Sequence, residues 1–187
     1  MLSDKYKIRV YKNTKSPLAT DWKGKKIENF IKNDKIDFNK FNYAFVCGKI
    51  NDFIVFDFDS YKMNYLELSE HPLYKQFKNI DHPVFNTYTV KSANGGYHFY
   101  YKYDSDFKNK NTDIHIDIKT DNGLIICPGS SIIKNNKKSY YKVVKDVPIK
   151  KMDDELKTWI FNNIYKGSPE NKTSYENSQI ISNNNIY

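Results

Sequence analysis

The chain has 187 residues and a mass of 22.2 kDa, enough for one compact domain with a tail. Its formal charge of +8, from 30 Lys+Arg against 22 Asp+Glu, favours a polyanionic partner, although the Lys-, Asn- and Ile-rich composition also fits an AT-rich coding sequence. Cys47 and Cys127 stand beside apolar residues, so buried thiols are expected rather than a disulfide or a zinc site. No run approaches the about 20 apolar residues of a membrane helix, and we expect a soluble, intracellular, cytoplasmic protein.

The first part of the chain predicts three strands and one helix. In chain order, apolar patterning predicts a strand over 6–11, a helix over 25–33 and strands over 43–47 and 53–59. The segment Lys15-Ser16-Pro17 begins a loop that runs to Trp22. The last of these strands ends in acidic residues, and we expect it to be central in its sheet.

The middle of the chain predicts short helices followed by hairpins. Residues 63–80 read as two short helices because Pro72 interrupts the pattern. The strands that follow are predicted over 86–92, 97–103, 114–119, 124–127, 131–134 and 139–144. Asn94-Gly95-Gly96 joins the first two strands as a hairpin, and Asn135-Asn136 joins the last two.

The chain is expected to end in a helix and a polar tail. Asp153 or Asp154 suits the helix N-cap, and apolar residues then recur at helical spacing: Leu156, Trp159, Ile160 and Ile164. Residues 166–187 have few apolar residues and no period, which is typical of a linker or disordered tail. The predicted organisation is therefore a catalytic domain over 1–165 and a tail over 166–187.

The acidic residues of the strand 53–59 carry the strongest chemical signal. Side chains alternate along a strand, so Asp57 and Asp59 share one face while Phe56 and Phe58 share the other. Two carboxylates on one face need a divalent cation or a basic partner if they are buried. They are half a metal site, and the alternatives are a solvated edge or a structural ion pair.

Two further segments have weaker signals when each is taken alone. In Ser92-Ala93-Asn94-Gly95-Gly96-Tyr97-His98, the glycines allow a backbone to approach a ligand, and His98 is placed to reach a phosphate; a tight turn and a structural histidine are the alternatives. In the alternating strand 114–119, Asp117 shares a face with His115 and Lys119. Asp113 and Asp121 compete with Asp117 as candidate ligands.

Taken in order, these three segments resemble the motifs of the archaeo-eukaryotic primase superfamily, and in particular the primase-polymerase domain found on plasmids, phages and large DNA viruses. The resemblance extends to the Lys15-Ser16-Pro17 segment with Trp22, to the strand ending at Gly48, and to Cys127-Pro128-Gly129-Ser130, which stands where Pro-Pro-Ser is usual. It covers residues 8–165. Some relatives carry a zinc-binding insertion, which two distant cysteines without suitable histidine spacing cannot supply here.

The resemblance implies a metal-dependent nucleotidyltransferase that makes or extends primers on a DNA template. Asp57, Asp59 and Asp117 would be catalytic and bind two Mg²⁺ or Mn²⁺ ions, which prefer hard oxygen ligands. The nucleoside triphosphate would be bound by Ser92, Gly95, Gly96, His98 and Lys119. Single-stranded DNA and a replicative helicase are the implied partners, and no membrane partner is expected.

The implied fold is mixed α/β (α+β). A mainly antiparallel central sheet with packed helices forms a catalytic core like an RNA-recognition motif, joined to a small N-terminal αβ unit. A metal-dependent nuclease using the same carboxylates and a catalytically inactive nucleic-acid-binding replication module remain as alternatives. A relaxase is disfavoured because His71, His82, His98 and His115 are scattered and form no His-x-His pair.

Overall fold

The computed structural model describes residues 2, 4–19, 31 and 36–166, which fall into two compact units. The second unit, residues 152–187, contains α3 (Asp154–Ile160) and a π-helical turn over Phe161–Tyr165. The four apolar residues predicted to recur along this helix are all buried: Leu156, Trp159, Ile160 and Ile164. The boundary expected between 165 and 166 stays a prediction, because 167–187 lie outside the described residues.

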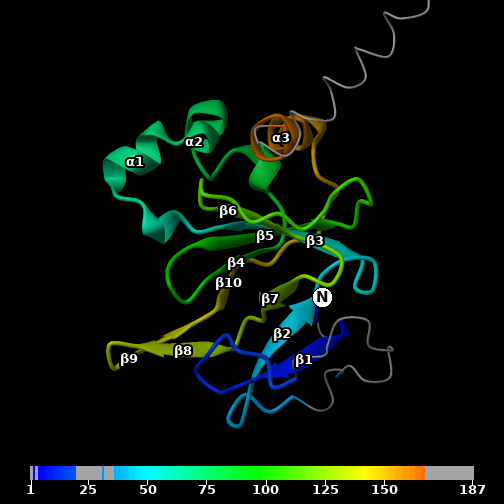
Figure 1. The fold of residues 1–187 in the computed structure, drawn as a ribbon, viewed down its shortest axis with the longest axis vertical. Helices are drawn as coiled ribbons and strands as arrows, with labels where there is room; N and C mark the ends of the chain where they lie inside the picture. The colour runs from blue at the N-terminus through cyan, green and yellow to red at the C-terminus, as the bar shows by residue number, and fades with distance from the viewer. Residues whose placement is uncertain (1, 3, 20–30, 32–35, 167–187) are drawn as a thin grey trace, which may run out of the picture. The chain divides into compact units, whose positions relative to one another are not determined.

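The first unit, residues 1–151, is built on a five-stranded sheet that carries the acidic strand (Figure 1). In spatial order its strands are β10 (Lys142–Lys145), β4 (Thr89–Lys91), β5 (Tyr97–Lys102), β3 (Phe53–Phe58) and β6 (Ile116–Lys119). Every neighbouring pair is antiparallel, and β3 pairs with β5 on one side and β6 on the other. The acidic strand is therefore internal, as predicted.

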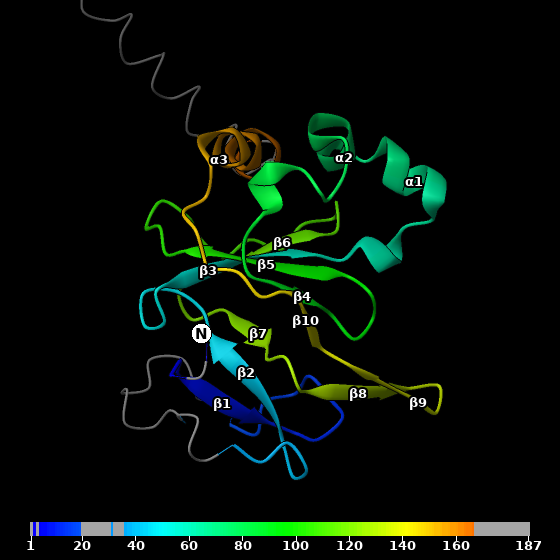
Figure 2. The ribbon, with the colours of Figure 1, turned by 180° about the vertical axis from the view of Figure 1, so that it is seen from behind.

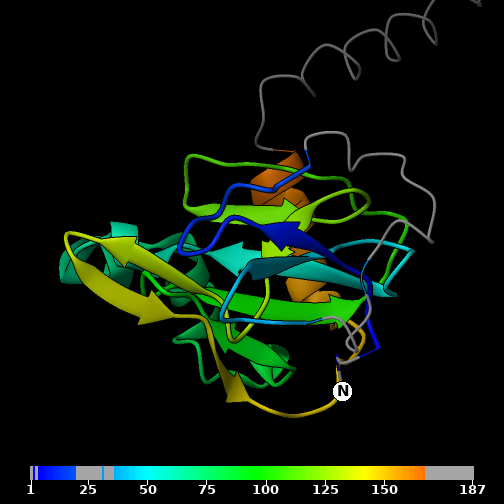
Figure 3. The ribbon, with the colours of Figure 1, turned by 90° about the horizontal axis from the view of Figure 1, so that it is seen from below.

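A smaller sheet lies against one face of this sheet (Figures 1 and 2). It consists of β1 (Lys7–Val10), β2 (Asn42–Val46) and β7 (Leu124–Ile126), all antiparallel. The two sheets share one apolar core, in which the Phe45 ring of β2 meets the rings of Phe53 (5.7 Å) and Tyr100 (6.3 Å). A hairpin of β8 (Ser131–Lys134) and β9 (Lys137–Tyr140), yellow in Figure 3, extends beside the sheets.

Helices cover the opposite face of the five-stranded sheet (Figure 2). These are α1 (Tyr65–Glu70) and α2 (Pro72–Phe77), with 3-10 turns over Ser60–Lys62 and Pro83–Phe85. Pro72 is the first residue of α2, where its missing N–H does no harm, so the predicted break is confirmed. Phe85 packs against Phe99 at 4.9 Å and Phe77 at 5.5 Å. The mixed α/β fold with mainly antiparallel sheets is confirmed.

Several strands that follow one another in the chain belong to different sheets, which local patterns do not reveal. β2 and β3 separate in this way, and so do β6 and β7. The arm predicted over 139–144 is two strands, because Tyr141 lies between β9 of the hairpin and β10 of the large sheet. The turn at Asn135-Asn136 is confirmed, since both residues have the positive φ that a tight hairpin turn requires (50° and 58°).

Two other predictions are not confirmed. One differs from the structure, and the other concerns residues that the structure does not describe. His115 has φ 60° and precedes β6, so it does not share the strand face of Asp117. The helix predicted over 25–33 and Trp22 lie outside the described residues, apart from Ile31, which forms a β-bridge with Lys7.

Two further observations concern the cysteines and the lengths of the helices. Cys47 and Cys127 are buried free thiols, and burial raises the pKa of both. Among the described residues, no helix has the length and apolar character that crossing a membrane would require.

Candidate active site

Strand register places two of the predicted acids directly opposite each other. Asp57 of β3 pairs with Asp117 of β6 in the antiparallel ladder. Asp59 follows the end of β3, and its N–H donates to the carbonyl of His115 just before β6 (2.8 Å). Like charges opposite each other on neighbouring strands destabilise a sheet unless something compensates them. The fold therefore gathers the acids at one end of the internal strand at an energetic cost.

His98 lies on the other side of Asp57, on β5. Its Nε2 is 3.5 Å from Asp57 Oδ1, and its side chain is almost fully buried. Within the described residues, Asp57 Oδ1 and His98 Nδ1 are buried and have no hydrogen-bond partner. Such unpartnered buried polar atoms call for an explanation, and a site for a ligand or ion is one. The side chain of Val55, two residues before Asp57, belongs to the core between the sheets, so Asp57 faces away from α1 and α2.

Burial acts on Asp57 and His98 in opposite directions. It is the main cause that raises the pKa of Asp57 to about 7, with the negative charges of Asp59 and Asp117 adding to it and Lys119 opposing it. Burial also lowers the pKa of His98 to about 3, helped by the positive charges of Lys15 and Lys119. The close approach of the two side chains is therefore not an ion pair at neutral pH, because His98 is uncharged there.

The other two acids have lysine partners. Lys62 contacts the Asp59 carboxylate at 2.5 Å, and Lys119 contacts Asp117 at 2.9 Å. Lys119 also donates to Asn111 Oδ1 (2.7 Å). The family resemblance implies a role for Lys119 in triphosphate binding, and the structure places this lysine beside Asp117. Lys62 was not predicted, although its position three residues after Asp59 could have indicated it.

The turn between β4 and β5 abuts the end of the acidic strand. A Cβ on Gly96 would lie 2.6 Å from the Phe58 carbonyl oxygen and 3.2 Å from Asp59 Cα, so only glycine fits. Gly95 has φ +104°, which also favours glycine. Ser92 Oγ accepts a hydrogen bond from the Gly96 N–H (3.0 Å) and so holds the turn closed. The Ser-x-x-Gly-Gly pattern therefore fixes a turn against Asp59.

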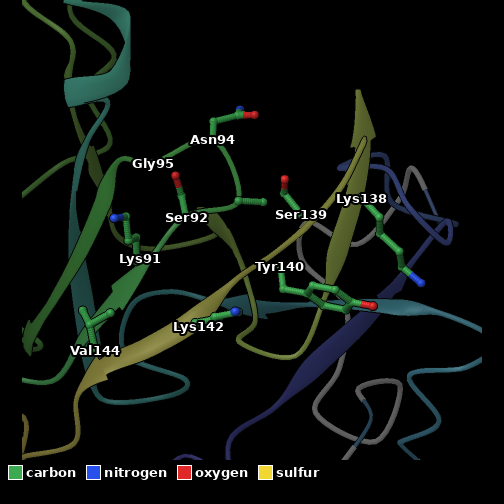
Figure 4. A pocket seen from close by; sticks show the side chains of 10 residues that line it. Lys91, Ser92, Asn94, Gly95, Lys138, Ser139, Tyr140, Lys142 and Val144 are labelled. Atoms are coloured by element: carbon green, nitrogen blue, oxygen red, sulfur yellow. The ribbon is translucent and has the colours of Figure 1, made fainter. Parts of the chain in front are cut away.

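Two of the predicted phosphate-binding residues line a separate open hollow of about 460 Å³. Ser92, Asn94 and Gly95 of the turn form one side of it, and β9 and β10 form the other (Figure 4). Its basic side chains are Lys91, Lys138 and Lys142. The three acids, His98 and Lys119 do not line it. The structure thus divides the predicted site residues between the end of β3 and this hollow.

Tyr141 is a site residue that the sequence did not predict. Its ring packs against that of His98 at 5.6 Å, and its buried hydroxyl has no hydrogen-bond partner among the described residues. Burial raises its pKa, and the negative charge of Asp57 adds to the shift. The Pro-Gly-Ser segment holds Tyr141 in place, because Ser130 O accepts from Tyr141 N–H and Gly129 N–H donates to Tyr141 O, both at 2.9 Å.

Carboxylates such as these three suit a divalent cation by their chemistry, but their arrangement in the structure is less suitable. Carboxylate oxygens are the ligands that Mg²⁺ and Mn²⁺ prefer, and the buried Asp57 Oδ1 has no hydrogen-bond partner in the described part of the chain. In the part of the chain that the structure describes, however, no three His, Cys, Asp or Glu side chains come together as a complete metal site. Lys62 and Lys119 neutralise the other two acids.

Two comparisons with known proteins bear on this arrangement. The family model described as bifunctional DNA primase/polymerase, N-terminal (Prim-Pol) matches residues 6–155 of the chain. A search of curated proteins finds no match. The matched range includes every acidic, glycine and histidine residue described above.

Proposed function

Since the chain belongs to the family of bifunctional DNA primase/polymerase N-terminal domains, we propose that it is a metal-dependent nucleotidyltransferase that makes or extends primers on a DNA template. The observation that carries the proposal is the placing of Asp57 between Asp117 and His98 on adjacent strands, with Asp59 at the strand end. Three carboxylates beside a neutral histidine suit phosphoryl transfer, which needs alignment and charge neutralisation rather than a protein nucleophile.

We assign metal binding to Asp57, Asp59 and Asp117. Two bound Mg²⁺ or Mn²⁺ ions would supply charge stabilisation for the attacking 3′-oxygen and the leaving pyrophosphate. Ionised Asp57 would provide its Oδ1, which has no hydrogen-bond partner among the described residues, and this requires loss of the proton that burial favours. Lys62 and Lys119 hold the neighbouring carboxylates in place and limit their mutual repulsion.

His98 and Tyr141 are assigned to the triphosphate of the incoming nucleotide. A neutral imidazole still carries one N–H, which can donate to a phosphate oxygen, and the Tyr141 hydroxyl can donate beside it. Neither group gives up a protein hydrogen bond among the described residues when it does so. The turn formed by Ser92, Gly95 and Gly96 packs against Asp59 and leads into β5, which carries His98.

Two other functions use part of the same geometry. A nuclease would use the same carboxylates and need no nucleoside triphosphate. An inactive replication module would keep the fold without the chemistry. The unpartnered atoms of His98 and Tyr141 favour a substrate that brings phosphate oxygens to the acids, and this supports the transferase.

De novo synthesis on single-stranded DNA tests the proposal. Wild type and an Asp57→Ala, Asp59→Ala double variant are incubated with labelled nucleotides and Mn²⁺ or Mg²⁺, with and without a supplied primer. Products from the wild type alone are expected, in either the primed or the unprimed reaction. Nucleotide-independent degradation of the DNA would instead identify a nuclease, and silence of the wild type in both reactions would leave the binding module.

A further inference from the structure

A basic surface lies beside the candidate site, and the strands that form it contain no acidic residue. Residues 122–145 contain no Asp or Glu, and they contain five lysines: Lys134, Lys137, Lys138, Lys142 and Lys145. All five lie on β8, β9 and β10. Lys91 of β4 adds a sixth positive charge, because Lys142 of β10 pairs with it in the ladder.

The hollow of about 460 Å³ lies within this surface and is called the lysine hollow below. Lys91, Lys138 and Lys142, the lysines that line it, are exposed. Within the described residues, the ion pairs of the protein use other lysines, so these three have no acidic partner. Three unneutralised ammonium groups around one hollow favour an anionic ligand.

Tyr140 adds an aromatic surface to the lysine hollow. It is the last residue of β9, it is 44% exposed, and the Lys138 ammonium lies over its ring at 5.4 Å from the ring centroid. Figure 4 shows Tyr140 and Ser139 on the side of the hollow that faces the turn residues Ser92 and Asn94. Lysines interleaved with an exposed aromatic ring are the combination that binds single-stranded nucleic acid, through phosphates and a stacked base.

We infer that the lysine hollow binds a single strand of nucleic acid, with phosphates at Lys138 and Lys142 and a base stacked on Tyr140. The inference rests on the proposed function and names the surface that holds its polymeric substrate. An incoming nucleotide fits the hollow less well, because its triphosphate must reach the acids, and Asp57, Asp59 and Asp117 do not line it. The basic run also continues to Lys134, Lys137 and Lys145, which suits a polymer.

Binding of a fluorescein-labelled oligothymidylate, followed by anisotropy at several salt concentrations, tests the inference without requiring catalysis. Loss of two phosphate contacts in a Lys138→Gln, Lys142→Gln variant should reduce the magnitude of the slope of log K against log salt by about 1.4. This corresponds to a loss of about 25-fold in affinity at roughly 0.1 M salt. The matched control, Lys49→Gln with Lys75→Gln, removes the same charge from exposed lysines elsewhere and should leave most of the slope intact.

Tyr140 is tested separately. Tyr140→Ala should weaken binding by about 5- to 100-fold through loss of a stacked base, and Tyr140→Phe, which keeps the ring, should restore affinity to within about twofold. Melting temperatures confirm that each variant is folded. A Tyr140→Ala variant that binds as tightly as wild type would contradict the assignment of this ring.

A nucleotide arm separates the two sources of phosphate. Stabilisation of the protein by a nucleoside triphosphate with Mn²⁺ should be the same in the Lys138→Gln, Lys142→Gln variant as in wild type. The inference is overturned if the variant loses this stabilisation but keeps strand binding, if its salt slope equals that of the control, or if wild type binds no strand. A wild type that binds the strand here but makes no product would sink the proposed function and leave the inference standing.

Discussion

Asp57 and His98 face each other across β3 and β5 in surroundings that suit neither charge. Burial raises the pKa of Asp57 to about 7 and lowers that of His98 to about 3. Between about pH 4 and pH 6.5, the unfolded chain has an ionised Asp and a protonated His, whereas the folded protein has the proton on Asp57. Folding changes which residue carries the proton but not how many are bound, so the pair contributes little net pH dependence to stability.

Single substitutions should reveal the opposite contributions of Asp57 and His98 to the pH dependence of stability. In Asp57→Asn, only His98 remains; the unfolded state then binds more protons, so the free energy of unfolding should rise with pH between about 4 and 6.5, by at most about 1.4 kcal/mol per pH unit. In His98→Gln, only Asp57 remains; the folded state binds more protons, so stability should fall as pH rises from about 4 to 7. Urea unfolding of metal-free protein measures both slopes.

Asp113→Asn provides the control for this series, because Asp113 is an exposed acid near the same strand. It should keep the pH profile of wild type. Variants of Asp57 and His98 whose profiles both follow wild type would contradict the opposed burial of the two groups.

Tyr141 separates a role in substrate binding from a role in folding. Its buried hydroxyl has no partner among the described residues, so Tyr141→Phe should leave the melting temperature unchanged or raise it. If the hydroxyl donates to the triphosphate, loss of that hydrogen bond should raise the KM for nucleotide by up to about tenfold, since such a bond contributes roughly 0.5–1.5 kcal/mol. Steady-state primer extension measures it, and an unchanged KM would remove Tyr141 from the site.

At the scale of elements, the β4–β5 turn should be sensitive to a single methyl group. The Cβ of Gly96→Ala would meet the Phe58 carbonyl at 2.6 Å, and backbone there cannot move without displacing Asp59. We expect a loss of about 1–3 kcal/mol in the free energy of unfolding together with reduced synthesis. The hydrogen bond that holds the turn closed is made by Ser92, so Asn94→Ala in the same turn should be close to neutral in urea unfolding. Equal stability of the two variants would refute the close packing.

Asn42 is a second element-scale test, because it ties three segments together. Its fully buried amide donates to Ser131 O (2.6 Å) and Thr14 O (2.9 Å) and accepts from Ser131 N–H (3.0 Å). Asn42→Ala should destabilise the protein by about 1–3 kcal/mol for each buried group left unpaired, with exposed Asn39→Ala as the control. Thermal unfolding compares them, and a shared melting temperature would show that these bonds add nothing.

The sequence predicts individual strands and turns better than it predicts which strands pair with each other. The acidic strand, the Gly95-Gly96 hairpin and the break at Pro72 follow from local alternation and backbone chemistry, and all three are found. Which strands pair depends on contacts between distant residues, so the division of 139–144 at Tyr141 could not be predicted. For the same reason the sequence indicated the acids and His98 one by one, but not that Tyr141 would pack against His98.

At the scale of the whole molecule, strands of the five-stranded sheet contribute to both the candidate active site and the lysine hollow. Asp57 faces away from α1 and α2 near the end of β3, and residues of the β4–β5 turn line one side of the lysine hollow. Part of the positive charge is thus concentrated where a polyanion is proposed to bind, on strands that contain no acidic residue.

The most direct test of the account is addition of one labelled nucleotide to a supplied primer on a template, in the presence of Mn²⁺. Wild type is compared with Asp117→Asn, which keeps the shape of the side chain opposite Asp57 but removes its charge. The account predicts that the variant melts at or above the temperature of wild type and loses about 10²–10³-fold in rate, as expected when a charge-stabilising group is lost from a transfer site. A variant that incorporates the nucleotide at the wild-type rate would contradict the proposed site.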